Sequence, residues 1–351
     1  MDDAAAPSAP CADCARAEEV HRVTDEKSGL DAWIVLHSTA LGPAFGGLRC
    51  ASYASDDAAL LDASGLAEAM TWKCASAELP GGGGKGVVQS DRLLDRGRAL
   101  DVLGDFIEHL RGRFKTAGDL GVTDADLRRI RTRTSSMADI DALGDLGDAV
   151  AIGLVATMRA VAPRIGAGDG ESLRNVHVAI QGLGAVGMAT ARRLVAAGAR
   201  VTVADTDASR CTAASRVGGI DVVAPHAITS VAADVFAPCA TGGVIDVDLA
   251  RSLRARAVIG GANRVLASAD AGIELARRGV QYAPDFLVNA GAVIRGAWHA
   301  LRGRAGTDAE IEAIAPRVVA CLDEASRRRT TPEAIALERA HARVHAARRP
   351  R

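Results

Sequence analysis

The stretch VHVAIQGLGAVGMATARRLVAAGARVTVAD, residues 176–205, decides the fold of this 351-residue chain. It opens with an apolar strand pattern at 176–181, continues through G-x-G-x-x-G into a helical pattern from residue 188, and closes with a second strand pattern at 200–205. A strand, a glycine turn, a helix and a second strand make a βαβ unit, whose two strands are parallel. The stretch therefore predicts a Rossmann-type, doubly wound parallel sheet.

The glycines of this stretch predict a dinucleotide site. Gly182 permits the tight turn, Gly184 lets the backbone approach a pyrophosphate, and Gly187 allows close packing of the helix. The cofactor-binding loop also contains Leu183, Ala185 and Val186. Asp205, at the end of the second strand, can accept hydrogen bonds from both ribose hydroxyls and would repel a 2′-phosphate. The predicted cofactor is therefore NAD rather than NADP.

The rest of the chain adds further strands and helices to the βαβ unit, so we predict an α/β protein with two domains. Apolar runs at 234–237 and 257–260 alternate with helical patterns, which continues the parallel sheet. We predict a cleft between an N-terminal α/β domain for substrate and oligomerisation and the NAD domain. The predicted segments are a disordered tail at 1–16, a substrate domain at 17–145, an NAD-binding domain at 146–290, and C-terminal helices at 291–351 that return toward the N-terminal domain. The last segment closes with two predicted helices, at 307–329 and 331–348.

Composition excludes several classes of function. The net charge of −1 and the aromatic content of 3% argue against a nucleic-acid partner. The first residues lack the basic and apolar regions of a signal peptide, and we predict no membrane-spanning helix. Seven scattered cysteines fit the reducing cytoplasm. Cys11 and Cys14 form one CxxC pair without a second pair, so no metal site is predicted.

Two lysines and an aspartate are the candidate catalytic groups. Lys73 ends an apolar helical pattern, and Lys85 follows the glycine run at 81–84 and opens a strand pattern at 85–90. We expect the bare backbone of the glycine run to crowd the cleft, so that Lys85 can lie beside a small substrate. Two ammonium groups in one cleft would bind a carboxylate and lower each other's pKa, so that one of them can exchange protons. Asp119 could take a proton from an amine. The alternative is that both lysines are solvated surface charges.

Several motifs resemble the leucine/phenylalanine/valine dehydrogenase branch of the Glu/Leu/Phe/Val dehydrogenase family. These motifs are MTWKCASAELPGGGGK (70–85), which contains both lysines, TAGDLGVTDAD (116–126), which contains Asp119, LGPAFGGLR (41–49), FAPCATGGVI (236–245), GGAN (260–263) and YAPDFLVNAGAVI (282–294). Their order matches that of the family over roughly residues 20–300. The resemblance implies NAD-dependent oxidative deamination of an L-amino acid to a 2-oxo acid, ammonia and NADH, by a homo-oligomer that is a dimer or larger.

The resemblance also implies residue roles. Lys73 would pair with the α-carboxylate of the substrate, Lys85 would activate the attacking water, and Asp119 would exchange protons with the amino group. The remaining implied contacts are Gly46, Gly47 and Asn289 to the substrate, Asn263 and Ala240 to the cofactor, and Phe45 and Ala117 to the substrate side chain. Phe45 would shrink a pocket for which we expect an apolar side chain.

The chain departs from the family near the nicotinamide. The segment GDLGDAVAIG, residues 144–153, lacks two prolines and a serine, and Val150 replaces a threonine that usually bonds the nicotinamide. Arg264 stands where a second asparagine is common. Two alternatives follow from these changes. One is a related oxidoreductase or coupling enzyme acting on an imine or 2-oxo acid in secondary metabolism, and the other is a non-catalytic NAD-binding regulator.

Overall fold

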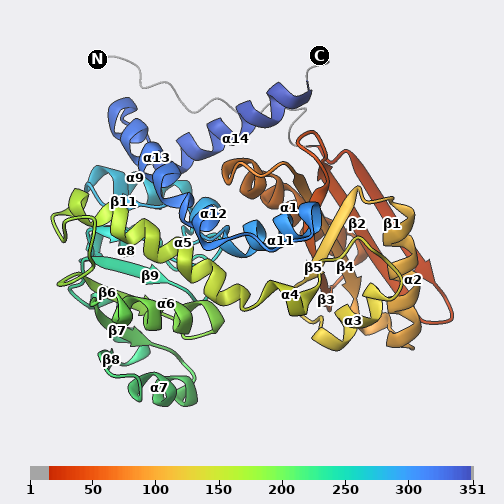
Figure 1. Ribbon diagram of the computed structural model, residues 1–351, viewed down its shortest axis with the longest axis horizontal. Coiled ribbons are helices and arrows are strands. Elements are labelled where there is room, and N and C mark those ends of the chain that lie inside the picture. The colour runs from red at the N-terminus through yellow and green to blue at the C-terminus, as the bar shows by residue number, and fades with distance from the viewer. Residues whose placement is uncertain (1–15, 349–351) are drawn as a thin grey trace. The chain divides into compact units, whose positions relative to one another are not determined.

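A computed structural model describes residues 16–348 of the chain (Figure 1). The predicted tail, apart from Arg16, and the Cys11–Cys14 pair lie outside the described residues. The described chain divides into two compact units. Unit 1 contains residues 16–144, 296–306 and 338–348, and unit 2 contains residues 145–295 and 307–337.

Unit 1 is built on a five-stranded mixed sheet of order β1-β2-β4-β3-β5. Its strands are β1 (Glu19–Asp25), β2 (Leu30–Ser38), β3 (Ala44–Ala51), β4 (Gly82–Gln89) and β5 (Phe114–Gly118). β2 is antiparallel to β1 and β4, whereas β3 is parallel to both β4 and β5. The carboxyl ends of β3, β4 and β5 therefore lie at one edge of the sheet.

The two faces of this sheet are covered by different helices. Helix α1 (Asp56–Ser76) covers one face, where Val87 of β4 packs against its small side chains. Helices α2 (Arg96–His109) and α3 (Asp124–Arg131) cover the other, where Val88 packs. Because side chains alternate along a strand, residues two apart on β4 share a face. Thr123 is the N-cap of α3 and forms a capping box with Asp126.

The strand predicted to follow the glycine run starts within the run, three residues earlier than predicted. Strand β4 starts at Gly82 and is the central strand of the sheet. Helix α1 crosses it so closely that a Cβ on Gly83 would strike the backbone of Ala67 and Thr71. Contact with the helix backbone thus explains the glycine at position 83, whereas a Cβ on Gly82 would strike the Ser38 carbonyl of β2.

Unit 2 contains a six-stranded sheet of order β11-β10-β9-β6-β7-β8. All of its strand pairs are parallel. The strands are β6 (His177–Gln181), β7 (Arg200–Ala204), β8 (Ile220–Val222), β9 (Val235–Pro238), β10 (Ala257–Val258) and β11 (Gln281–Tyr282). The chain builds outward from β6 on one side and then returns to its other side at β9. This order is that of the doubly wound dinucleotide-binding fold, as predicted.

The helices of unit 2 connect and cover these strands. They are α5 (Leu146–Val161), α6 (Ala185–Ala196), α7 (Ala208–Ser215), α8 (Val247–Ser252), α9 (Ala269–Arg277), α10 (Asp285–Val288), α12 (Asp308–Glu312) and α13 (Ile314–Arg328). The helical run 140–165, which includes the short α4 (Ile140–Leu143), is long and apolar enough to cross a membrane by composition. Yet 61% of its most apolar window is buried within the protein. Leu154 and Met158 of α5 are fully buried, which marks α5 as a core helix.

The C-terminal part has more helices than the two that we predicted for 307–329 and 331–348. The first range is divided into α12 and α13, because Thr307 and Glu310 form a capping box on α12 and a second helix begins at Ile314. α11 (Gly291–Arg302) precedes them, and α14 (Pro332–Arg348) follows. The second half of α14 belongs to unit 1, where the His341 ring stacks on Trp72 with centroids 4.0 Å apart.

Glu333, in the first turn of α14, makes the stability of unit 2 depend on pH. Burial, with a smaller contribution from the Asp285 carboxylate, raises the pKa of Glu333 from 4.5 to about 7. Because the pKa is raised on folding, the associated stability is present below the unfolded value and is lost as the pH rises through about 7. Glu333→Gln should therefore stabilise the protein by about 1–2 kcal/mol above about pH 8, and by much less near pH 5.

Thermal unfolding of Glu333→Gln at both pH values checks this expectation. The matched control is Glu171→Gln, because Glu171 is exposed in the loop before β6. A gain in Tm that is equal at the two pH values would show that Glu333 acts through packing rather than through its charge.

Candidate active site

Lys85, Asp119 and Arg49 meet at the carboxyl edge of the unit 1 sheet. Lys85 lies on β4, two residues before Val87 and therefore on the α1 face, and only 5% of it is exposed. Its ammonium donates to Oδ2 of Asp119, the residue that follows β5. Arg49 on β3 donates from Nε to the same oxygen at 3.1 Å. Two cations from neighbouring strands thus converge on one carboxylate oxygen.

The electrostatics of this cluster favour proton exchange. Burial lowers the pKa of Lys85, Arg49 adds to that effect, and Asp119 offsets it only in part. For Asp119, burial alone would raise the pKa, but the Lys85 ammonium, hydrogen bonds and the Arg49 guanidinium hold it below its ordinary value. Asp119 is therefore a carboxylate at neutral pH, and Lys85 loses its proton more readily than an ordinary lysine. Perturbations of this kind are typical of catalytic groups.

The other predicted substrate residues of unit 1 lie on β3, on β5 and at the end of α1. Gly47 is paired with Ala117 in the sheet, and a Cβ on Gly47 would touch the Asp119 side chain. Gly46 pairs with Thr116, and a Cβ there would strike the Gly84 carbonyl. The Phe45 ring is buried against Gly81. Lys73 lies partly buried in the last turn of α1.

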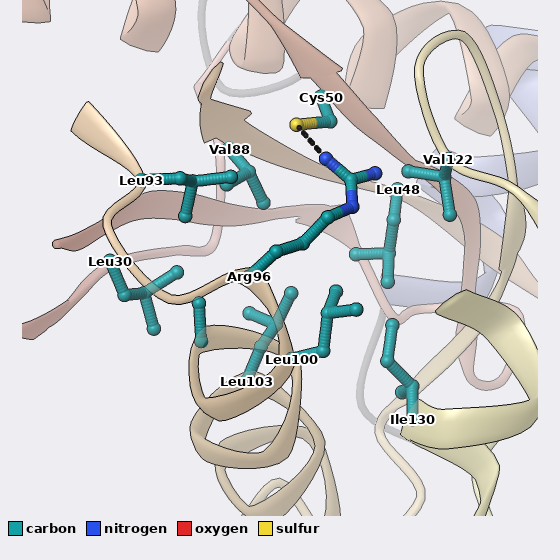
Figure 2. A pocket seen from close by; sticks show the side chains of 11 residues that line it. Leu30, Leu48, Cys50, Val88, Leu93, Arg96, Leu100, Leu103, Val122 and Ile130 are labelled. Atoms are coloured by element: carbon teal, nitrogen blue, oxygen red, sulfur yellow. Dashed lines mark hydrogen bonds between the residues drawn. The ribbon is translucent and has the colours of Figure 1, made fainter. Parts of the chain in front are cut away.

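A void in unit 1 lies away from this chemistry. Figure 2 shows it lined by Leu48, Val88, Leu100 and Ile130, with the Arg96 guanidinium donating to the Cys50 thiol at 3.5 Å. These residues belong to the core between the sheet and α2, on the face opposite Lys85. Its volume of about 10 Å³ is room for roughly one water molecule. The void is therefore a packing feature and not a substrate pocket.

In unit 2 the glycine loop lies at the carboxyl end of β6. A Cβ on Gly187 would strike the Gly182 carbonyl, so the helix can approach the turn only because this residue is glycine. Space above Gly184 is open, since no atom lies within 4 Å of a Cβ placed there. Helix α6 begins at Ala185, three residues earlier than predicted, and directs its N-terminus toward this space. The loop therefore has the shape and polarity of a pyrophosphate site.

Asp205 directly follows β7 and accepts a hydrogen bond from this loop. Its Oδ2 accepts from the Leu183 N–H at 2.6 Å and its Oδ1 from the Asp207 N–H at 2.8 Å. Burial opposes ionisation, but these backbone donors, together with Arg210 at 3.6 Å, hold the pKa of Asp205 below its ordinary value. An ionised carboxylate therefore faces the position of the adenine ribose in this fold.

Asn289, a predicted substrate residue of unit 2, is hydrogen-bonded to Asn263, a predicted cofactor residue. Its Nδ2 donates to the Gly261 and Ala262 carbonyls at 3.3 Å each and to Asn263 Oδ1 at 2.9 Å. These three acceptors fix the orientation of the amide. Asn289 is only 5% exposed, and its Oδ1 is buried without a hydrogen-bond partner. A buried acceptor that lacks a donor fits a ligand that brings an N–H group.

The loops after β9 and β10 lie beside the glycine loop at the carboxyl edge of the unit 2 sheet. Ala240, after β9, lies against Gly182, and Gly242 lies against Asn263. All of these positions follow the carboxyl ends of parallel strands, where doubly wound folds bind nucleotides. The open glycine loop and the Asp205 carboxylate together fit a dinucleotide, and the unpartnered Asn289 oxygen is an acceptor for a further ligand group.

Two features were not found by sequence reasoning. The Arg49 role was missed because β3 was not assigned as a strand; once it is, the alternation of Phe45, Gly47 and Arg49 places all three on one face. Arg264 has a φ of 51°, in the left-handed region that suits asparagine or glycine. The Cβ of a residue in that conformation costs about 1–2 kcal/mol, and asparagine suits the position because its short polar side chain can form local hydrogen bonds.

The family models and the relatives that match this chain all describe amino-acid dehydrogenases. Residues 16–136 match the family model described as Glu/Leu/Phe/Val dehydrogenase, dimerisation domain, and residues 204–347 match Glutamate/Leucine/Phenylalanine/Valine dehydrogenase. The chain is 38% identical over 288 residues to a phenylalanine dehydrogenase of Bacillus thermotolerans, covering 79% of this chain and 75% of that protein. It is also 38% identical over 282 residues to a leucine dehydrogenase of Thermoactinomyces intermedius, with coverages of 79% and 76%.

Solved structures give the same answer for the fold. The crystal structure of L-tryptophan dehydrogenase from Nostoc punctiforme has a TM-score of 0.83 and 30% identity, and the alignment covers 96% of this chain and 98% of that one. The matches confirm the resemblance predicted from the motifs and the α/β fold of two domains.

Proposed function

Because this chain belongs to the Glu/Leu/Phe/Val dehydrogenase family and is an amino-acid dehydrogenase, we propose that it oxidises an L-amino acid with an apolar side chain, using NAD and not NADP. The products are the 2-oxo acid, ammonia and NADH, and the reverse reaction is reductive amination. The observation that carries the catalytic assignment is the ion pair between the buried Lys85 and the half-buried Asp119, whose pKa values are both lowered.

The protein residues handle the protons of this reaction. The substrate ammonium must lose a proton before Cα can give up a hydride, and Asp119 is the carboxylate that takes it. Loss of the hydride leaves an iminium carbon, which water attacks while Lys85 takes a proton from that water. The resulting carbinolamine collapses to the 2-oxo acid and ammonia. Bound NAD would supply the hydride acceptor, at the edge formed by the Gly182–Gly187 loop, Asp205, Ala240 and Asn263.

We assign substrate binding to the predicted residues of unit 1 and, separately, to Asn289 of unit 2. We assign the α-carboxylate to Lys73 with the backbone of Gly46 and Gly47, because a fixed carboxylate holds Cα in place for reaction. Phe45 and Ala117 line the side-chain pocket in this assignment, which favours an apolar group. The Asn289 oxygen, buried without a donor, is the acceptor for a substrate N–H.

The experiment that tests this function is an NADH absorbance assay over a panel of L-amino acids, with leucine, phenylalanine, valine, tryptophan and glutamate included. We expect turnover with an apolar amino acid and NAD, and none with glutamate. Binding of NAD without turnover of any member would favour the regulator. Turnover only with imines or with 2-oxo acids in the absence of ammonia would favour the coupling enzyme that the altered 144–153 segment suggested.

The Asp205 carboxylate predicts the choice of cofactor. Replacement by serine removes the charge that repels a 2′-phosphate, while Arg210 remains nearby to pair with one. We expect the ratio of kcat/KM for NAD to that for NADP to fall by about 10²-fold, corresponding to about 2.7 kcal/mol. Steady-state kinetics with both cofactors measures it. The control is Asp221→Ser, which removes an exposed carboxylate on β8, and a ratio that stays unchanged in Asp205→Ser would contradict the assignment.

We also propose a homo-oligomer in the cytoplasm. The matched N-terminal family model is described as a dimerisation domain, and a related glutamate dehydrogenase of Thermus thermophilus, 25% identical, is a hetero-hexamer. The five described cysteines are free thiols, which suits a reducing compartment.

A further inference from the structure

Arg49 connects the catalytic carboxylate to a second, supporting carboxylate. Its Nε donates to Asp119 Oδ2 at 3.1 Å, and its Nη1 donates to Asp62 Oδ2 at 3.0 Å. Asp62 lies on α1 and also accepts from the Tyr53 hydroxyl at 2.7 Å. The guanidinium is therefore held from two sides, one on the helix and one at the end of β5.

The two cations bind the same oxygen of Asp119 and leave the other without a cationic donor. Lys85 and Arg49 both donate to Oδ2, and Oδ1 accepts from neither cation. An amine can therefore give its proton to Oδ1 without displacing either cation. Because Asp62 holds the far side of the Arg49 guanidinium, Arg49 presents a single N–H to Asp119 and does not bind both of its oxygens.

The charges of the cluster balance. Lys85 and Arg49 are cationic, and Asp119 and Asp62 are anionic, so no net charge is buried at this edge of the sheet. The side chains of Arg49 and Asp62 are 24% and 30% exposed, against 7% for Lys85. Since partly buried pairs are screened less than surface pairs, Arg49 acts on both catalytic groups at short range.

We propose that Arg49 is a positioning residue, which fixes the Asp119 carboxylate with Oδ1 toward the substrate amine and keeps a positive charge beside Lys85. The proposal rests on the catalytic roles proposed above for Lys85 and Asp119. It gives Asp62 and Tyr53 the supporting role of orienting the guanidinium.

The proposal has a signature in the pH dependence. The Arg49 charge lowers the pKa of Lys85 and also that of Asp119, with Asp62 opposing it at Lys85. Removing that charge raises both pKa values, so Lys85 holds its proton to higher pH. The acid limb of kcat/KM, which rises as the base is deprotonated, must then move toward alkaline pH.

The experiment compares Arg49→Gln, Arg49→Lys and Asp62→Asn with the unmodified chain. For Arg49→Gln we expect kcat to fall about 10–100-fold, KM for NAD to stay within about twofold, and the acid limb to move by about one pH unit. In Arg49→Lys the acid limb of kcat/KM should return to its original pH, because lysine keeps the positive charge. The kcat should recover only in part, because lysine lacks the planar guanidinium group. Asp62→Asn should lower kcat less than Arg49→Gln does. The matched control is Arg129→Gln, which breaks an exposed pair between α3 and α2.

A second measurement is independent of turnover. The chain has only four lysines, so isotope labelling of the lysine side chains allows the Lys85 resonance to be assigned and titrated by NMR. The titration of Lys85 should move to higher pH in Arg49→Gln and stay near the original value in Arg49→Lys. A folded Arg49→Gln whose Lys85 titration and acid limb are both unchanged overturns the proposal. If the unmodified protein oxidises no amino acid, the proposed function fails, while the titration still decides whether Arg49 acts on Lys85.

Discussion

Replacement of Lys85 by methionine is expected to lower kcat by about 10²–10⁴-fold while changing the Kd for NAD by less than about threefold. Methionine keeps the length and apolar stem of lysine but cannot take a proton from water. The Asp119 carboxylate retains Arg49 as a partner at 3.1 Å, so the variant does not bury an unpaired charge. The NAD-binding residues lie in the other compact unit, whose fold the substitution does not touch.

The measurements for Lys85→Met are steady-state kinetics and NAD titration by fluorescence or calorimetry, with Tm as the check on folding. Lys27→Met is the matched control, because Lys27 lies exposed in the turn between β1 and β2. Parallel losses of kcat and of NAD affinity would mean that Lys85 supports the structure and is not a base. A kcat within about tenfold of the original would remove Lys85 from the chemistry altogether.

The Rossmann unit was predictable because its signals are local. The strand, G-x-G-x-x-G, helix and Asp205 follow one another within thirty residues, and each sets a local backbone conformation. Unit 1 was less predictable. Strand β3 has two glycines and β4 has four of its eight residues as glycine, so neither has the β-branched pattern by which strands are recognised. These strands exist because α1 and the neighbouring strands pack against their backbones, which is a tertiary effect.

The same distinction applies to the catalytic residues. Lys85 and Asp119 were found because each stands beside glycines at an apparent element end. Arg49 was missed because its role depends on the register that places β3 between β4 and β5, and on the helix that brings Asp62 to its other side. Sequence spacing can indicate a reactive group, but a partner that acts across three strands and a helix is visible only in the fold.

Asp119→Asn is expected to lower kcat by about 10²–10⁴-fold and to move the titration of Lys85 in the direction opposite to that of Arg49→Gln. The amide has nearly the same shape as the carboxylate but cannot accept a proton from the substrate ammonium. It also removes the anion that offsets the burial of Lys85, whose pKa should then fall further. In the NMR titration Lys85 should lose its proton at lower pH, although the enzyme is less active.

The opposite directions of the Lys85 shift in Asp119→Asn and Arg49→Gln distinguish an electrostatic effect from a change in packing. A variant that merely disturbed the fold would move Lys85 toward the pKa of a solvated lysine whichever partner was removed, because opening the site relieves the burial that lowers it. The control is Asp105→Asn, since Asp105 forms an exposed pair with Arg133. If Asp119→Asn and Arg49→Gln shifted Lys85 in the same direction, electrostatic coupling within the cluster would be excluded as the cause. Shifts of opposite sign would establish that the anion and the cation act on Lys85 through their charges.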